Sequence, residues 1–479
     1  MEENRELKKK TIVSTISLFF QSGFSAVLGL AANLVLTILL SPAIFGIYIT
    51  ILSMISLLNY FSDIGLAASL IQKKEITNKD VSTTFTIQQI LILTLIIVAF
   101  SLTPFIIKFY NLPVEGKYLY WSLLLSFFLS SLKTIPSVFL ERKIQFQKIV
   151  LVQILENTVF YVSVIIFAIL GFKLKSFTYA VFFRSIVGLL FIYILSPWVP
   201  KVGVEWNHLK RLLKFGVPFQ ASSFLALFKD DLITLYLGKA LGFEGLGYIG
   251  WAKKWAEAPI RIIMDNLSRV LFPVIARIQH DKEKISRLVE KILRYQTMIL
   301  APSVIGLTLT MNVLVSVIPK YGKWQPAIPL FYIFCLSSLF SSYSTPFMNL
   351  FNALGKVKIS FTFMAIWTIT VWILTILLTP ILRTYGFPVA QLILSATFLF
   401  VVWQAKRIIR FSYIQPIYKP LLATIFMGIS LFLIQKFLPL SILSLGFTII
   451  LGVFIYFILL LVLFNINLIT EVKSLLTYE

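Results

Sequence analysis

The sequence has very few of the residues on which soluble enzymes, metalloproteins and disulfide-bonded proteins depend. Its 479 residues include one cysteine, so no internal disulfide is possible. The only histidines, His208 and His280, are far apart in the sequence, and nothing resembles a Cys/His metal cluster or a Ser-His-Asp arrangement. Charged residues make up 13% of the chain, against about 25% in a soluble domain. These absences exclude a soluble protein and argue against an enzyme.

Apolar residues are what the sequence has instead, at 58% with a mean hydropathy of +0.90, and they predict an all-α integral membrane protein. The net charge of +23 does not indicate nucleic-acid binding, because the basic residues lie in short loops between apolar runs rather than on a soluble module. That distribution is typical of topology determinants and of contacts with lipid headgroups. Membrane lipids are therefore expected partners, and nucleic acid is not.

Apolar stretches long enough to cross a bilayer predict fourteen transmembrane helices. They are 12–40, 44–71, 84–107, 118–140, 149–170, 176–196, 215–238, 245–276, 293–318, 326–352, 359–380, 385–405, 417–435 and 441–464. The first is too long for a signal peptide and should be retained. If the N-terminus is cytoplasmic, the inner loops hold 27 of the 43 basic residues, the outer loops 9 and the spans 7. This asymmetry predicts that both termini are cytoplasmic.

A faint internal repeat suggests the domain organisation. Phe45–Tyr48 at the start of the second span resembles Leu246–Tyr248 at the start of the eighth, about 200 residues later. We therefore predict a six-helix lobe over 1–200, a second over 201–410, and two additional helices with a short tail over 411–479. With six helices in each, the lobes would share one orientation, and the substrate would lie in a central cavity between them.

Nucleotide-binding motifs are missing or lack the required context. Gly245-Leu-Gly247-Tyr-Ile-Gly250 formally matches G-x-G-x-x-G, which binds dinucleotides only between a strand and a helix. Here it joins two spans, so we expect a tight, closely packed turn. No P-loop sequence is present, and no cofactor is predicted.

The stretch from Trp251 to Arg277 contains a row of charges of alternating sign, one helical turn apart, that covers roughly 24 Å of a helix. The row consists of Lys253, Glu257, Arg261, Asp265 and Arg269. Ionisable groups at membrane depth are costly and usually face a cavity, so the row predicts a cavity-lining helix of a transporter. A helix that lies along the membrane surface with its charges solvated is the alternative.

Aromatic residues fall near several predicted span ends. Trp198, Trp206, Tyr321 and Trp324 are expected at the membrane interface, where amphipathic rings are enriched. Trp251 and Trp255 flank the charged row, where stacking on a sugar and an interfacial position are both open interpretations.

Other ionisable residues fall inside or beside predicted spans, and bases outnumber acids among them. An excess of bases favours binding of an anionic substrate. The planar guanidinium of arginine can bind the oxygens of a diphosphate bidentately. The candidate substrate-binding residues are Arg261, Arg269, Lys253, Arg184 and Lys133. The candidate residues for coupling to a proton or sodium ion are Asp63, Asp230, Asp231, Glu156, Glu257 and Asp265. The alternative for any one of them is that it only ties helices together.

Several short motifs, in order along nearly the whole chain, resemble the Wzx-like polysaccharide-export flippases of the MOP transporter superfamily. They begin at Phe61, Leu271, Ala301, Lys323 and Asn352, and read FSDIGLAASLIQ, LFPVIARIQHD, APSVIGL, KWQPA and NALGK. The resemblance implies two six-helix lobes around a cavity that opens alternately to each side of a prokaryotic plasma membrane. It also implies a cargo of lipid-linked oligosaccharide, usually on undecaprenyl diphosphate.

The resulting hypothesis is a transporter that flips a lipid-linked oligosaccharide for polysaccharide biosynthesis, with a polymerase and glycosyltransferases as possible partners. A MATE-like antiporter of cationic drugs has the same architecture, but its cargo would favour an acidic cavity. A membrane-embedded glycosyltransferase or ligase usually has a large soluble part, which this sequence lacks. A passive scaffold for a synthesis complex stays open.

Overall fold

The computed structural model describes residues 2–221 and 224–463, without the side chains of 2–12, 15, 215, 218–219, 221, 224–226, 265–266, 269–270 and 463. The described residues form helices and no strand, so the predicted all-α class is confirmed. The chain divides into two compact units, Met1–Gly247 and Tyr248–Glu479, with the boundary inside the long helix α11. The predicted division at residues 200 and 410 stays a prediction.

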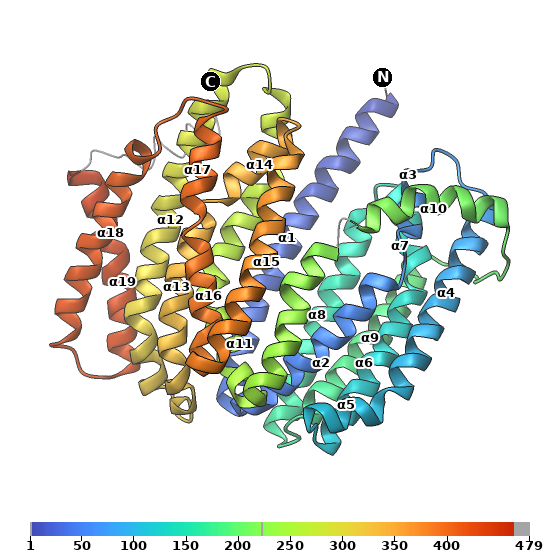
Figure 1. Cartoon of the computed structure of the whole chain (residues 1–479), viewed down its shortest axis with the longest axis horizontal. Helices are drawn as coiled ribbons and strands as arrows, with labels where there is room; N and C mark the ends of the chain where they lie inside the picture. The colour runs from blue at the N-terminus through green and yellow to red at the C-terminus, as the bar shows by residue number, and fades with distance from the viewer. Residues whose placement is uncertain (1, 222–223, 464–479) are drawn as a thin grey trace. The chain divides into compact units, whose positions relative to one another are not determined.

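Unit 1 contains ten helices and the first part of α11 in its described residues (Figure 1). Its core joins α2, α6, α8 and α9 through buried side chains such as Ile51, Leu119, Val164 and Ala180. The short helices α3, α7 and α10 lie together at one end of the unit, and α5 lies at the other (Figure 1). The bounds are α1 (Glu2–Leu39), α2 (Pro42–Phe61), α3 (Leu66–Gln72), α4 (Asn78–Ser101), α5 (Thr103–Tyr110), α6 (Val114–Leu132), α7 (Thr134–Arg142), α8 (Phe146–Ile169), α9 (Lys175–Leu195), α10 (Trp206–Ala221) and α11 (Phe224–Arg277).

Unit 2 contains the rest of α11 and the elements that follow it. Its main core packs α12 against α14 and α17 through Ile285, Val289, Phe347 and Val401. Helices α18 and α19 pack on each other and on α12 (Figure 1). The bounds are α12 (Lys282–Val317), η1 (Gly322–Ala327), α13 (Ile328–Ser342), α14 (Thr345–Ala353), α15 (Val357–Leu382), η2 (Arg383–Tyr385), α16 (Gly386–Ser395), α17 (Phe398–Lys406), α18 (Ile414–Gln435), α19 (Ile442–Ile458) and η3 (Leu459–Leu463).

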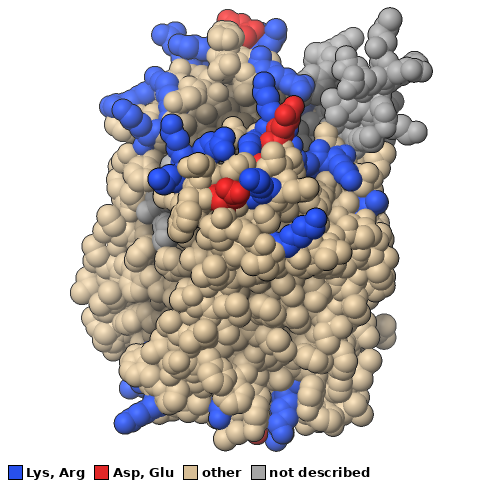
Figure 2. Space-filling model, turned by 90° about the vertical axis from the view of Figure 1, so that its right-hand side faces the viewer, with Lys and Arg blue, Asp and Glu red and all other residues tan. Residues whose placement is uncertain are grey.

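By length and composition, the described residues contain 11 helical segments apolar enough to cross a membrane. Ten correspond one to one with predicted spans, and the 50-residue segment Val357–Lys406 covers the two spans predicted at 359–380 and 385–405. The spans predicted at 215–238 and 245–276 fall largely on α11, whose charges lower its hydropathy. On the face drawn in Figure 2, charged side chains gather toward the two ends and leave a band with few charged residues between them, with Lys and Arg most numerous at one end. The chain is a multi-pass membrane protein.

Helices begin or end at other residues than predicted in three places. The span predicted at 44–71 ends as a helix at Phe61, because Ile64 and Gly65 adopt positive φ values of 47° and 74° before α3 begins. The turn expected at Gly245–Gly250 lies instead at Gly242, whose φ of 71° interrupts α11, while residues 245–250 are helical. Half of the loop expected at 197–214 is instead the start of α10, whose Leu209 and Leu212 are buried beside α3 and α4.

Glycine allows α2 and α11 to cross at backbone contact. A side chain at Gly46 would overlap the carbonyl of Phe243, and one at Gly247 would overlap the carbonyl of Pro42. The two glycines of the suggested sequence repeat therefore contact each other's helix. Close packing was expected at Gly247, and it is confirmed.

Two aromatic residues expected at the interface are instead fully buried. Tyr321 and Trp324 are 0% exposed, and both pack on Trp251. The Trp251 indole stacks on Trp324 at 5.4 Å between ring centroids and donates to the Tyr321 hydroxyl at 2.9 Å. Trp251 is itself buried, so its ring is a packing element of unit 2 and is not exposed to stack on a sugar.

The α2–α11 crossing predicts an unusual effect of a glycine-to-alanine substitution. In a helix this change normally stabilises by about 0.5–1 kcal/mol, but at Gly46 the new methyl would meet the Phe243 carbonyl. We expect Gly46→Ala to lower the free energy of unfolding by about 1–3 kcal/mol. Unfolding in mixed SDS micelles measures it. Gly23→Ala in α1, where a methyl meets nothing within 4 Å, is the matched control, and equal stability of the two variants would contradict the crossing.

Candidate functional site

The first group of predicted site residues meets inside unit 1. Pro136 cannot continue the hydrogen-bonding of α6, so the helix breaks at Lys133 and resumes as α7. The Lys133 ammonium forms an ion pair with the Glu156 carboxylate of α8, and both side chains are largely buried. A side chain at Gly188 of α9 would overlap this carboxylate, so glycine makes room for Glu156 there. Lys133, which was predicted to contact the substrate, is thus paired with Glu156, which was predicted to couple transport to an ion.

Arg184 lies one turn before Gly188 on α9 and extends the same region. Its guanidinium carbon is 5.7 Å from the centroid of the Phe160 ring, and that ring packs on the rings of Tyr48 and Tyr161. The Tyr48 ring in turn stacks on the Phe177 ring, with 4.1 Å between their centroids. We name Lys133, Glu156 and Arg184 the α8–α9 cluster. It has two bases and one acid.

Two of the three aspartates predicted for ion coupling in unit 1 have a hydroxyl or backbone partner. Asp231 of α11 accepts a hydrogen bond from the Ser56 hydroxyl of α2 at 2.9 Å, and its neighbour Asp230 is exposed. Asp63 lies in the turn before α3 and accepts from the Ala67 amide at 3.1 Å, so it caps that helix. Burial raises the pKa of the Asp63 carboxyl, and the Ala67 amide opposes this effect.

The charged row of α11 forms the second group, in unit 2. Glu257 accepts from Arg261 at 2.9 Å, and its other oxygen is 3.8 Å from the Lys253 ammonium. Lys253 also lies 5.6 Å from the centroid of the Phe387 ring. The predicted pairing along the helix is therefore confirmed for Lys253, Glu257 and Arg261, which we name the α11 row. The side chains of Asp265 and Arg269 lie outside the described residues.

Exposure separates the members of the α11 row. Glu257 is 22% exposed and Lys253 29%, whereas the Arg261 side chain is 70% exposed. One carboxylate serves two bases, so the row has an excess positive charge that no described acid balances. Among its described side chains, Arg261 is the group most able to contact an anion.

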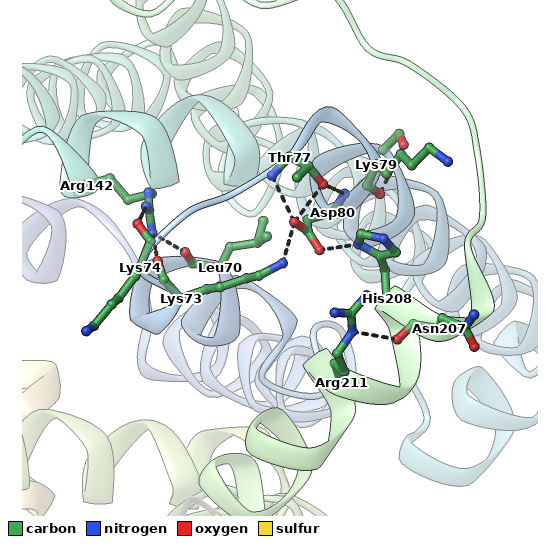
Figure 3. A network of polar contacts seen from close by, with 11 residues as sticks. Leu70, Lys73, Lys74, Thr77, Lys79, Asp80, Arg142, Asn207, His208 and Arg211 are labelled. Carbon is green, nitrogen blue, oxygen red and sulfur yellow. Dashed lines mark hydrogen bonds and ion pairs between the residues drawn. The ribbon is translucent and has the colours of Figure 1, made fainter.

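A buried hub at one end of unit 1 was missed by the sequence analysis (Figure 3). Asp80 is 1% exposed and accepts from the Lys73 ammonium at 2.6 Å and from the Thr77 amide at 2.9 Å. Its second oxygen lies 2.6 Å from Nδ1 of His208 on α10. The hub joins α3, α4 and α10. Thr77-Asn-Lys-Asp80 is a capping box, a signal that the sequence does contain.

Arg142 fastens α7 to the same end of the unit (Figure 3). Its guanidinium donates to the carbonyls of Leu70, Lys73 and Lys74, two of them at 2.6 and 2.8 Å. These carbonyls lie at and just beyond the C-terminus of α3, where helical partners are missing and a positive charge is favourable. Asp80 and Arg142 therefore both hold the C-terminal end of α3, the helix that follows the turn at Asp63.

Comparison of the chain with known proteins agrees with the resemblance seen in the sequence. The model of a family described as polysaccharide biosynthesis protein matches residues 35–329, more than half of the chain. The lipopolysaccharide biosynthesis protein WzxC of Escherichia coli (strain K12) is 27% identical over 347 residues, 70% of this chain and 68% of that one. The teichuronic acid biosynthesis protein TuaB of Bacillus subtilis (strain 168) is 24% identical over 387 residues, 77% of each.

Solved structures show the fold. The lipid II flippase MurJ in an inward closed conformation matches with a TM-score of 0.75 over 95% of this chain and 99% of that chain, at 17% identity. An inward-facing multidrug resistance MATE family transporter of the MOP superfamily matches with a TM-score of 0.60 over 82% of this chain and 94% of that chain, at 15% identity. The chain has the fold of these two transporters, as the sequence resemblance implied. At these identities the likeness concerns the fold and not the cargo.

The Lys133–Glu156 pair predicts strong coupling between two substitutions. Removal of one partner from a buried pair leaves an uncompensated charge, so Glu156→Gln should lower the free energy of unfolding by about 3 kcal/mol. The double variant Lys133→Met/Glu156→Gln should lose less than the two single variants combined, because no lone charge remains. A double-mutant cycle in SDS unfolding measures the coupling, and simple additivity would rule it out.

The Asp80 hub predicts a contrast between a buried and an exposed pair. Asp80→Asn removes the charge that binds Lys73 and His208, and should cost about 2 kcal/mol of stability. Lys79→Gln, one residue earlier, breaks only the exposed pair with Glu205 and should have little measurable effect. The same unfolding assay compares the two variants. An Asp80→Asn protein as stable as Lys79→Gln would show that the hub does not hold α3, α4 and α10 together.

Proposed function

The chain belongs to this family of polysaccharide biosynthesis proteins, and on that premise we propose that it flips a lipid-linked oligosaccharide of the undecaprenyl-diphosphate type across the membrane. The names of its relatives support the proposal, because WzxC and TuaB are polysaccharide biosynthesis proteins, and MurJ, a lipid II flippase, shares its fold. The observation on this chain that carries it is the exposed guanidinium of Arg261 in a row with an excess of positive charge.

The charge of the two clusters matches a diphosphate better than a cation. Both the α8–α9 cluster and the described α11 row contain two bases and one acid. Two phosphate groups offer oxygens that an arginine fork can bind bidentately, with charge-assisted hydrogen bonds. Organic cations, the cargo of the alternative MATE-like antiporter, would be repelled by the excess base. We assign Arg261, Arg269, Lys253, Arg184 and Lys133 to the diphosphate and sugar.

The prenyl chain of such a substrate is as apolar as the bilayer and does not need to leave it. The work of the protein is then to move the polar diphosphate and sugar past the hydrocarbon region, where an unpaired charge is costly. We propose that alternating access does this, with a population shift between states that open to opposite sides.

We also propose that transport is coupled to a proton or sodium ion held by an acidic side chain. Among the described side chains, Glu156 and Glu257 pair with bases, whereas Asp63, Asp230 and Asp231 have no base within ion-pair distance. Asp231, half-buried with a serine hydroxyl, is the first candidate to hold a proton or sodium ion. Asp63 is second, since its cap of α3 gives the carboxylate a structural role. Asp265 stays a candidate from the sequence.

The cellular setting follows from the same premise. We propose that the protein lies in the plasma membrane of a prokaryote with both termini cytoplasmic, as the loop charges predict. It would act between the glycosyltransferases that build the oligosaccharide and the polymerase that consumes it. A direct complex with these enzymes is one form of the proposal.

Charge reversal at Arg261 tests the assignment in cells. In a strain that lacks its own copy, Arg261→Glu should reduce surface polysaccharide at least about tenfold, because it removes the exposed phosphate contact. Arg261→Lys keeps the charge but loses the fork, so it should retain part of the activity. Surface polysaccharide is quantified at matched membrane expression.

The control is Lys358→Glu, a charge reversal at an exposed position at the start of α15 in the same unit. It should leave export close to that of the wild type. Full export by Arg261→Glu would remove the α11 row from the substrate path. Full export together with drug sensitivity of the deletion strain would favour the antiporter.

A further inference from the structure

A basic pocket lies in unit 2, apart from the α11 row. It has a volume of about 590 Å³ and is formed by the first turns of α12 and by the end of α17 with the segment that follows. We name it the α12–α17 pocket, and its charged lining residues are Lys282, Glu283, Arg287, Glu290, Lys406, Arg407 and Arg410. Five bases face two acids, although the two walls are more than a hundred residues apart in the sequence. The excess of basic residues in the predicted inner loops explains why bases lie here, but it does not explain why they line a pocket.

The walls of the pocket are fixed to the core of unit 2. Ile409, between two of the basic residues, is 2% exposed and packs in the same cluster as Ile285 and Val289 of α12. The Glu290 carboxylate accepts from the Ser412 amide at 2.7 Å, which ties the segment after α17 to α12. The bases are therefore held in place on an anchored segment and do not sit on a free tail.

Little of the positive charge is neutralised within the pocket. The Glu290 carboxylate is engaged by the Ser412 amide, and Glu283 reaches only Arg287, at 3.5 Å between two highly exposed groups. Among the described side chains, Lys282, Lys406 and Arg410 have no carboxylate within ion-pair distance. Such a site attracts a multivalent anion, and a phosphate group fits it in charge.

The surface beside the pocket indicates where that phosphate comes from. Leu399, Phe400 and Trp403 on α17 are all more than half exposed, on a helix within a segment apolar enough to span the membrane. The next turn brings Arg407, whose guanidinium carbon lies 3.6 Å from the centroid of the Trp403 ring. An apolar surface that ends at a tryptophan marks the hydrocarbon boundary, so the pocket opens at the level of the lipid headgroups.

We propose that the α12–α17 pocket binds the phosphate of an anionic membrane phospholipid, whose acyl chains lie along Leu399 and Phe400. Basic pockets at helix ends are suited to such headgroups. The site is independent of the transported substrate, and it makes the lipid a bound component of unit 2. Free phosphate has the same chemistry but would not use the exposed apolar surface of α17.

Native mass spectrometry of the full chain, titrated with phosphatidylglycerol, tests this proposal. The variant Arg407→Gln/Arg410→Gln should weaken binding of the tightest phosphatidylglycerol about 30-fold, which corresponds to about 2 kcal/mol for two basic residues. Phosphatidylcholine, which has a phosphate but no net charge, should not occupy the site in either protein. The variant Lys282→Gln/Lys406→Gln, which changes both walls, should give a similar loss and provides a second test if the first variant folds poorly.

The control variant Lys201→Gln/Lys210→Gln removes two exposed bases from unit 1 and should change the affinity by less than about threefold. An equal loss in the control and pocket variants would overturn the proposal, because it would mean that only net charge matters. Displacement of the phospholipid by millimolar inorganic phosphate would also overturn it and assign the pocket to a soluble anion. Persistence of the bound lipid in that buffer supports the headgroup.

Discussion

An ionisable side chain in an apolar helical bundle is stable only if an opposite charge or a hydrogen-bond partner compensates for its lost hydration. This constraint accounts for the buried ion pairs of the protein. Lys133 is held by Glu156, for which Gly188 leaves room, and Asp80 is surrounded by donors from three helices. Arg261 shares its carboxylate with Lys253 and stays largely exposed. Ionisable side chains that are fully paired hold the helices of a unit together. Side chains with uncompensated charge are the ones that can bind a charged substrate.

Interruptions of the helices place these groups. Lys133 lies where Pro136 ends the continuity of α6, and Asp63 lies in the turn created by the positive φ values of Ile64 and Gly65. Gly242 interrupts α11 between Asp231 and the charged row. A break allows a side chain to reach a different helix, as Lys133 does with α8.

Features that depend on neighbouring residues could be predicted from the sequence. Apolar length predicts nearly all of the spans, and the four-residue spacing predicts the pairing of Glu257 with Lys253 and Arg261. Contacts between residues distant in the chain could not be predicted, because helical periodicity does not encode which helices meet. Asp80 and His208 are 128 residues apart, and Trp324 was placed at the interface although it is buried against Trp251. The end of the second span was missed because Asp63-Ile-Gly65 lies inside a stretch that is apolar enough to continue.

The central claim, that this chain moves a lipid-linked oligosaccharide across the membrane, is tested most directly in proteoliposomes. The purified protein is reconstituted with labelled undecaprenyl-diphosphate oligosaccharide, and the access of an external glycosidase to the label is followed with and without a proton or sodium gradient. The account predicts that the protein increases access beyond that in empty liposomes, and that one of the gradients accelerates the increase. Equal access in protein-free and protein-containing liposomes, with several oligosaccharides, would contradict it.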